Sequence, residues 1–260
     1  MSFVEDLFSL EGTVAAAIGA GGVLAGEMAK GLAAAGAKVA VLDLNPAAAE
    51  AVAKAIRTET GSESIALKID ATSKADIQRS LDDIVAKWGR IDTLINAPGI
   101  NSATPFFDIA EDEYDRIMQV NLKSMFLACQ VYGKFMVDQE QGGSIINISS
   151  ASSGPPLSKV FTYSVSKAGV NNLTQFLARE WATSRVRVNA VAPGFFPAEQ
   201  NRKILTQDRV ESIFRHTPMS RFGEPSELVG AVVWLASQKA SSFVTGAIVR
   251  VDGGYTAMTI

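Results

Sequence analysis

The sequence predicts an α/β fold in which a doubly wound parallel sheet of about seven strands carries helices on both faces, in a single domain over residues 1–260. Short apolar runs alternate with longer amphipathic ones along the chain, as strands alternate with helices. Hairpin signals are missing between the apolar runs, so each strand should return through a helix to a parallel neighbour. No linker, repeat or low-complexity segment interrupts this pattern. One domain is therefore expected.

The expected elements can be placed in order along the chain. The strands are expected at 14–18, 38–42, 64–69, 93–95, 144–148, 187–190 and 247–251. The helices between them are expected at 23–35, 46–59, 74–88, 111–137, 163–183 and 226–237. Such an order is typical of a Rossmann-type sheet, which binds its ligands at the carboxyl ends of the strands. Segments 154–156 and 193–197 contain Pro or Gly directly after strands, so we expect them to border a site, with a substrate lid at about 194–224.

Composition excludes several classes of function. The 260 residues are 47% hydrophobic, which is enough for a sizeable core, and the net charge of −3 gives no footprint for nucleic acid. The first residues are acidic where a secretory signal is basic, and no apolar segment is long enough to span a membrane. We therefore expect a cytoplasmic protein whose partners are a small-molecule substrate and further copies of the chain.

The chain has one Cys, Cys129, and one His, His216. Together they cannot supply a disulfide, a zinc site or a Cys–His nucleophile pair, so no metal is expected. Cys129 is interpreted as a small buried core residue, and His216, beside the expected lid, as structural or part of an interface. Other residues must carry the chemistry.

A dinucleotide site is predicted at the first strand. Gly19, Gly21 and Gly22 lie between this strand and the following helix, where a pyrophosphate can approach the backbone and the free N–H groups of the helix. Asp43 follows the second strand, 21 positions after Gly22, as a carboxylate that binds a ribose 2′-hydroxyl does. Its charge would repel a 2′-phosphate, and no Lys or Arg stands nearby to attract one. The predicted cofactor is NAD rather than NADP.

A second group of residues predicts the reaction. Tyr163 and Lys167 are four positions apart at the start of a helix, so both side chains can face one cleft. A phenol is a weak base at neutral pH, but a neighbouring ammonium stabilises the phenolate and lowers its pKa. Tyr163 can then exchange a proton with an alcohol or carbonyl oxygen while a hydride moves to or from the cofactor.

The chain resembles the short-chain dehydrogenase/reductase family over nearly its whole length. Ser150 stands 13 positions before Tyr163, as the substrate-orienting serine of that family does, and Asn121 matches the helix Asn that supports a proton-relay water near the lysine. The resemblance thus implies a catalytic tetrad of Asn121, Ser150, Tyr163 and Lys167. The glycine turn and the resemblance together place the cofactor contacts at Gly19, Gly21, Gly22, Val23, Leu24, Asp43, Leu44, Asp70, Ala71, Asn96, Ala97, Pro98, Tyr163, Lys167, Pro193, Gly194 and Phe196.

The sequence departs from the family pattern in the glycine turn and the lid. Val23 and Ala25 replace glycines near the pyrophosphate, Ala198 replaces a common Thr, and Pro98 cannot donate a backbone N–H. These changes leave the tetrad intact. A working enzyme is therefore favoured over a nucleotide-binding sensor or scaffold without catalysis.

The same segments are similar to the sugar-acid branch of the family, which includes D-mannonate oxidoreductases and gluconate dehydrogenases. The candidate substrate contacts are Ser152, Gln200, Asn201 and Arg202, because an Arg in the lid can bind a carboxylate. The expected activity is the NAD-dependent interconversion of a secondary alcohol and a ketone on a sugar acid or polyol. The alternative enzyme is a reductase of 3-oxoacyl thioesters on acyl carrier protein. The resemblance also implies a homotetramer built from helices 111–137 and 163–183.

Overall fold

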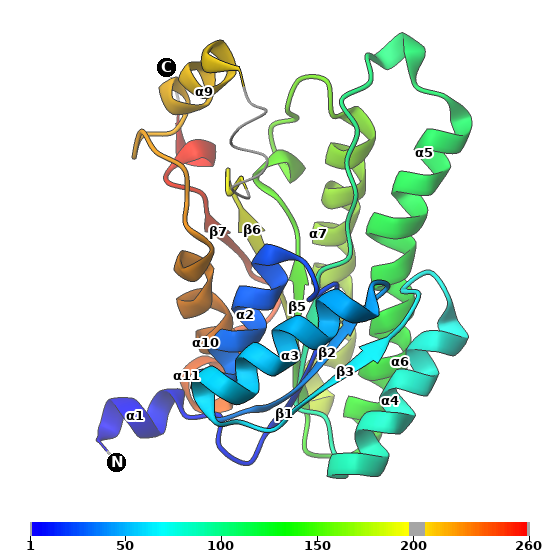
Figure 1. Cartoon of the computed structure of the whole chain (residues 1–260), viewed down its shortest axis with the longest axis vertical. Coiled ribbons are helices and arrows are strands. Elements are labelled where there is room, and N and C mark those ends of the chain that lie inside the picture. Colours follow the sequence, from blue (N-terminus) through cyan, green and yellow to red (C-terminus); the bar gives the residue numbers. More distant parts are fainter. Residues whose placement is uncertain (1, 198–205, 259–260) are drawn as a thin grey trace.

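The protein is described here by a computed structural model that covers residues 2–197 and 206–258. Its centre is a parallel sheet of seven strands in the order β3-β2-β1-β4-β5-β6-β7 (Figure 1). The strands are β1 (Val14–Ile18), β2 (Lys38–Asp43), β3 (Ser64–Lys68), β4 (Thr93–Asn96), β5 (Gly143–Ile148), β6 (Val186–Pro193) and β7 (Ile248–Val251). The α/β fold and the single doubly wound sheet predicted from the sequence are confirmed.

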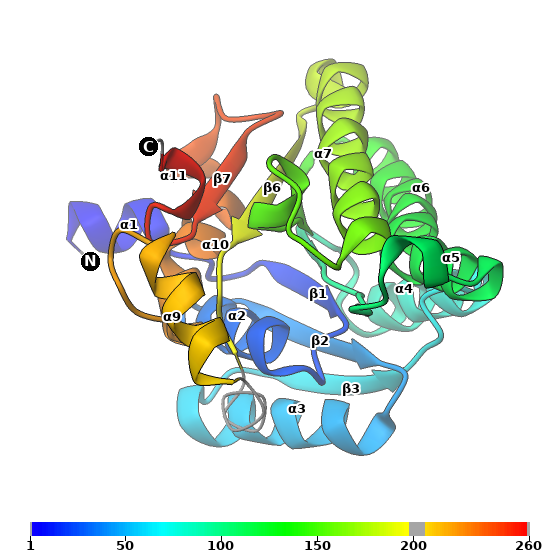
Figure 2. The same ribbon diagram turned by 90° about the horizontal axis from the view of Figure 1, so that it is seen from above.

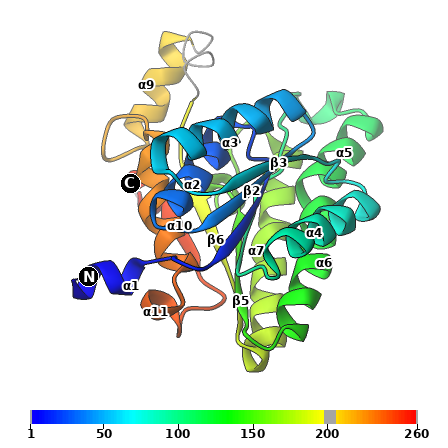
Figure 3. The same ribbon diagram turned by 60° about the horizontal axis from the view of Figure 1, so that its bottom comes forward.

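Helices cover both faces of this sheet (Figures 2 and 3). One core cluster packs α2 (Val23–Ala34), α3 (Pro46–Thr60) and α10 (Val229–Ala236) against the sheet. The other packs α4 (Lys74–Trp88), α6 (Ser124–Asp138) and α7 (Phe161–Trp181) against the opposite face. Because every central strand is covered on both sides, β1, β4 and β6 are buried along their whole length.

Local sequence signals fix where several helices begin and end. The Asn45 side chain accepts hydrogen bonds from the backbone N–H groups of Ala47 and Ala48 at the start of α3, and Pro46 occupies the first helical position. Ser73 caps α4 in the same way, and Gly89 ends that helix with a φ of 77°. These helices were predicted within one residue of their observed ends.

Three features depart from the prediction. A short helix, α1 (Phe3–Phe8), precedes β1, and α9 (Gln207–Arg215) lies within the segment that was expected to form the lid. The predicted helix 111–137 consists of α5 (Glu111–Met118), a π-helical segment (Gln119–Lys123) and α6. A π turn adds one residue to a helical turn without changing which residue types are favoured, so the apolar periodicity does not reveal it.

The strand order reverses between β1 and β4, which are neighbours in the sheet although two strands separate them along the chain. An open α/β sheet forms its ligand crevice at this point, outside the carboxyl ends of the strands. The glycine turn after β1 and the turn after β4 lie on its two sides. Within the described ranges, no helix is long and apolar enough to cross a bilayer.

Candidate active site

The glycine turn is built around the Asp43 carboxylate. Its Oδ2 accepts a hydrogen bond from the backbone N–H of Gly21 at 3.0 Å, and its Oδ1 accepts one from Asn45 at 2.9 Å. A Cβ on residue 21 would lie 2.7 Å from the carboxylate carbon, so this approach requires glycine. Gly22 caps α2 without a side chain, which leaves the N-terminal N–H groups of the helix open to an anion.

The turn after β4 packs directly against this glycine turn. Gly19 has a φ of 79°, and a Cβ there would lie 3.0 Å from the carbonyl oxygen of Ala97. Pro98, the next residue in the second turn, is buried. Val23 and Ala25, which stand where the family pattern has glycines, point to different environments. Val23 is 57% exposed, whereas Ala25 packs in the core.

The carboxyl ends of β2 and β3 form the outer part of the crevice. Leu44 is exposed next to Asp43, and Ala71 is half-buried beside Asp70. One oxygen of Asp70 accepts hydrogen bonds from the backbone and hydroxyl of Thr72, at 2.8 and 2.7 Å. This carboxylate is therefore used to close its own turn.

Asn96 does not point its side chain into the crevice. The side chain is fully buried, and its Nδ2 donates to the carbonyl of Met125 and to Oδ1 of Asn147, both at 3.2 Å. These hydrogen bonds link β4 to α6 and β5. A contact of Asn96 with the cofactor would therefore use its backbone and not its side chain. Cys129 lies in the same buried group, and burial raises the pKa of its thiol to about 12, which fits the predicted core role.

Tyr163 and Lys167 lie one turn apart on α7, with the Lys167 Nζ 5.7 Å from the centre of the tyrosine ring. The Lys167 side chain is 3% exposed, and its ammonium donates a 2.8 Å hydrogen bond to the carbonyl of Ile148 at the end of β5. Burial lowers the pKa of Lys167 to about 8. Burial also raises the pKa of the Tyr163 phenol, and the neighbouring Ser150 hydroxyl acts in the opposite direction.

Asn121 occupies the π-helical segment and is completely buried. Its amide Nδ2 donates to the Ile100 carbonyl at 2.9 Å and to the Ser166 hydroxyl at 3.1 Å, while Oδ1 accepts the Ile100 N–H at 2.8 Å. A Cβ on Gly99 would lie 3.7 Å from this Oδ1 and 3.6 Å from the Nζ of Lys167. Asn121 and Lys167 therefore border the same space beside the turn after β4.

Ser150 and Ser152 belong to one hydrogen-bonded turn after β5. The Ser150 hydroxyl accepts the N–H of Ser152 at 3.2 Å and lies 3.1 Å from the Ser152 hydroxyl. Ser152 is 1% exposed, so it supports Ser150 and offers little surface to a substrate.

Sequence reasoning missed the residue that holds this turn. Asn171 stands one turn after Lys167 on α7, accepts the Ser149 hydroxyl at 2.6 Å and donates to the Ser153 hydroxyl at 2.8 Å. Ser153 in turn donates to the backbone carbonyl of Ser150 at 2.6 Å. The signal available in the sequence was spacing, because residues 163, 167 and 171 follow one another at intervals of four.

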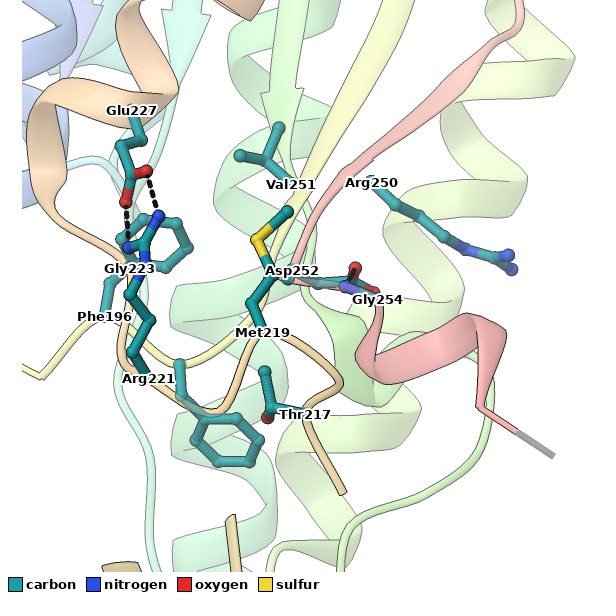
Figure 4. Close-up of a pocket in the computed structure, with 12 residues that line it drawn as sticks. Phe196, Thr217, Met219, Arg221, Gly223, Glu227, Arg250, Val251, Asp252 and Gly254 are labelled. Carbon is teal, nitrogen blue, oxygen red and sulfur yellow. Dashed lines mark hydrogen bonds and ion pairs between the residues drawn. The ribbon is translucent and has the colours of Figure 1, made fainter. Parts of the chain in front are cut away.

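The segment after β6 leads toward the expected lid. Gly194 approaches the C-terminal turn so closely that a Cβ would lie 2.7 Å from the Cα of Asp252. The ring of Phe196 packs on Gly223, where it borders a cavity of about 370 Å³ that contains the ion pair of Arg221 and Glu227 (Figure 4). The side chain of Phe196 thus faces this neighbouring cavity. The candidate substrate residues Gln200, Asn201 and Arg202, and Ala198 with them, lie outside the described residues.

Comparisons with known proteins agree with this geometry. A family model described as enoyl-(acyl carrier protein) reductase matches residues 19–256. The chain is 36% identical over 255 residues to the 2-dehydro-3-deoxy-D-gluconate 5-dehydrogenase of Escherichia coli (strain K12), with 98% of this chain and 99% of the relative covered.

Solved structures share the whole fold, as two examples illustrate. A protein of Haemophilus influenza, provisionally assigned as a D-mannonate oxidoreductase and holding NAD, superposes with a TM-score of 0.93 at 36% identity, covering 98% of this chain and 99% of its own. The gluconate 5-dehydrogenase of Burkholderia cenocepacia J2315, in complex with NADP and tartrate, gives a TM-score of 0.93 at 33% identity, covering 98% and 100%.

Proposed function

Because this chain belongs to the short-chain dehydrogenase/reductase family, we propose that it is an NAD-dependent enzyme that interconverts a secondary alcohol and a ketone on a sugar acid or polyol. The substrate would be of the mannonate/fructuronate or gluconate type, as the names of the relatives suggest. The observation that carries the proposal is the convergence of Ser150, Tyr163 and Lys167 at the carboxyl end of β5.

The residues of the crevice fit a dinucleotide. The close contact of Gly21 with Asp43 and the uncapped start of α2 supply a carboxylate for a ribose and N–H groups for a pyrophosphate. Asp43 favours NAD, since the charge of a 2′-phosphate would meet its carboxylate. When bound, NAD⁺ would accept a hydride from the substrate carbon in oxidation, and NADH would supply one in reduction.

The proposed roles of the side chains follow from their contacts. Tyr163 gives its proton to the ketone oxygen during reduction and takes it from the hydroxyl during oxidation. The charge of Lys167 favours the phenolate of Tyr163, and Ser150 orients the substrate oxygen by a hydrogen bond. Asn121 holds a relay water beside Lys167, a role supported by the space at Gly99 that both side chains border.

The direct test is a substrate panel followed at the nicotinamide absorbance, with D-mannonate, D-gluconate, their keto forms, uncharged polyols and a 3-oxoacyl thioester. Turnover of sugar acids with NAD(H) is expected, and Tyr163→Phe should lower kcat by about a thousandfold or more while the Kd for NADH changes little. Activity on the thioester alone would support the alternative reductase. NADH binding without turnover of any compound would support a sensor.

Assembly as a homotetramer is also part of the proposal. Phe126 on α6 and Phe176 on α7 are 43% and 57% exposed, although large apolar side chains are usually buried. They lie on two of the helices that the family resemblance implicates in assembly.

A further inference from the structure

A small cavity of about 180 Å³ lies between α9, the segment that precedes α7, and the turn after β7. Its walls include Ser158, five positions before Tyr163, and Phe195, directly after Gly194. The Phe195 ring meets the Tyr255 ring edge-to-face at 5.3 Å, which joins the walls that come from β6 and β7. The cavity is therefore bounded by the same loops that leave the carboxyl ends of β5 and β6 beside the site.

Two cationic or cation-forming side chains line this cavity, one from α9 and one from the residue that ends it. Arg209 and His216 are seven positions apart, two helical turns, and therefore share a face. The Nδ1 of His216 lies 2.7 Å from the Ser212 carbonyl oxygen, which can only accept. Nδ1 must donate this bond, so Nε2 is the ring nitrogen left for a ligand, and it donates to an anion when the ring is in its imidazolium form.

The Arg209 side chain is exposed. Across the described part of the chain, no carboxylate lies within ion-pair distance of its guanidinium. Arg209 and Tyr255 both line the cavity, and the guanidinium charge acts to lower the pKa of the Tyr255 phenol, which burial raises. None of the described residues that line the cavity is acidic.

This chemistry selects an anion of small size. A guanidinium presents paired N–H donors that match a carboxylate, and the hydroxyls of Ser158 and Tyr255 can add further bonds. A site of about 180 Å³ lined by these groups suits a small polar anion such as a carboxylate.

We propose that Arg209 and His216 form a subsite for the carboxylate of the substrate, which places the sugar-acid end in this cavity and the reacting alcohol carbon at Tyr163. The inference rests on the proposed function and deepens it. Such a subsite would select acids over neutral polyols. It assigns recognition of the substrate carboxylate to Arg209 and His216 rather than to residues 200–202.

The test compares Arg209→Gln with Arg215→Gln, an exposed arginine of the same helix that does not line the cavity. Calorimetric titration of D-gluconate and D-mannonate into each protein saturated with NADH measures binding without turnover. The Kd for the acids should rise tenfold or more in Arg209→Gln and stay within about twofold in Arg215→Gln. The binding of the neutral analogue D-glucitol should be the same in all three proteins.

Equal effects of the two substitutions, equal effects on the acid and the polyol, or no binding of acids to the unaltered chain would each overturn the subsite. A second variant, His216→Gln, should weaken acid binding in the same direction but less. Thermal melting of each variant confirms that it is folded.

Turnover separates the two proposals. If acid binding depends on Arg209 but no alcohol is oxidised, the proposed function alone is overturned. If the sugar acids are oxidised and Arg209→Gln changes neither their binding nor their turnover, the subsite alone is overturned.

Discussion

Lys167 combines a cost in folding free energy with a proposed catalytic role in one side chain. Its ammonium is buried beside Tyr163 and has a hydrogen bond to the Ile148 carbonyl, and burial lowers its pKa from 10.5 to about 8. Such a change corresponds to roughly 3 kcal/mol against the charged form in the folded chain. The buried ammonium costs folding free energy at the place where its charge would favour the phenolate of Tyr163 in the proposed mechanism.

The cost predicts a pH-dependent effect of Lys167→Met on stability. Between about pH 8 and 10.5 the unfolded chain holds a proton that the folded chain has released, so the unfolding free energy contributed by Lys167 rises with pH. Removing the ammonium should therefore stabilise the protein most at pH 7, by up to about 3 kcal/mol less the lost hydrogen bond, and about half as much at pH 9.5. Urea unfolding at both pH values measures this, and an equal difference at both would contradict it.

The single carboxylate of Asp43 is expected to set the preference for NAD over NADP. Asp43→Ala removes the carboxylate that faces the glycine turn and the repulsion of a 2′-phosphate. The ratio of kcat/KM for NAD to that for NADP should fall by tenfold or more. Asp70→Ala, which alters a carboxylate used in its own turn, is the control and should leave the ratio within about threefold. A preference for NADP in the unaltered protein would refute the assignment.

At the scale of elements, α7 positions the site through one face. Tyr163, Lys167 and Asn171 succeed one another at intervals of four, and the last two bind the end of β5 and the turn after it. The π turn at Asn121 fixes the loop after β4 from the other side, through both backbone groups of Ile100. The geometry of the candidate site is therefore set by the packing of two helices against strand ends.

Asn171→Ala tests the role of α7 in holding Ser150. Losing the bonds to Ser149 and Ser153 should lower kcat about tenfold and leave NADH binding unchanged, whereas the exposed neighbour in Asn172→Ala should change neither. If Asn171 acts through Ser150, the substitution should add little to the loss already caused by Ser150→Ala. If the kcat losses of Asn171→Ala and Ser150→Ala multiply in the double variant, Asn171 does not act through Ser150.

At the scale of the whole molecule, the two layers of helices differ in the aromatic side chains that they expose. The layer with α6 and α7 exposes Phe126 and Phe176, which supports its proposed use as an interface between copies. Phe126→Glu combined with Phe176→Glu should reduce the mass measured by light scattering after size exclusion from a tetramer to smaller species. Phe243→Glu, at a fully exposed position on another part of the surface, should leave the mass unchanged. A monomeric unaltered chain would contradict the assembly.

The sequence alone determined the sheet and most of its helices, and it predicted the tetrad. Apolar periodicity, caps and the spacing of the glycine turn, Ser150, Tyr163 and Lys167 are properties of residues close together in the chain. The tertiary structure decided the partners that come from distant segments. It showed that Asn96 faces the core, that Asn171 holds the serine turn, and that α9 brings Arg209 to a cavity that Tyr255 also lines. These contacts join residues that no local pattern relates, because they arise only when the ends of different strands meet at one edge of the sheet.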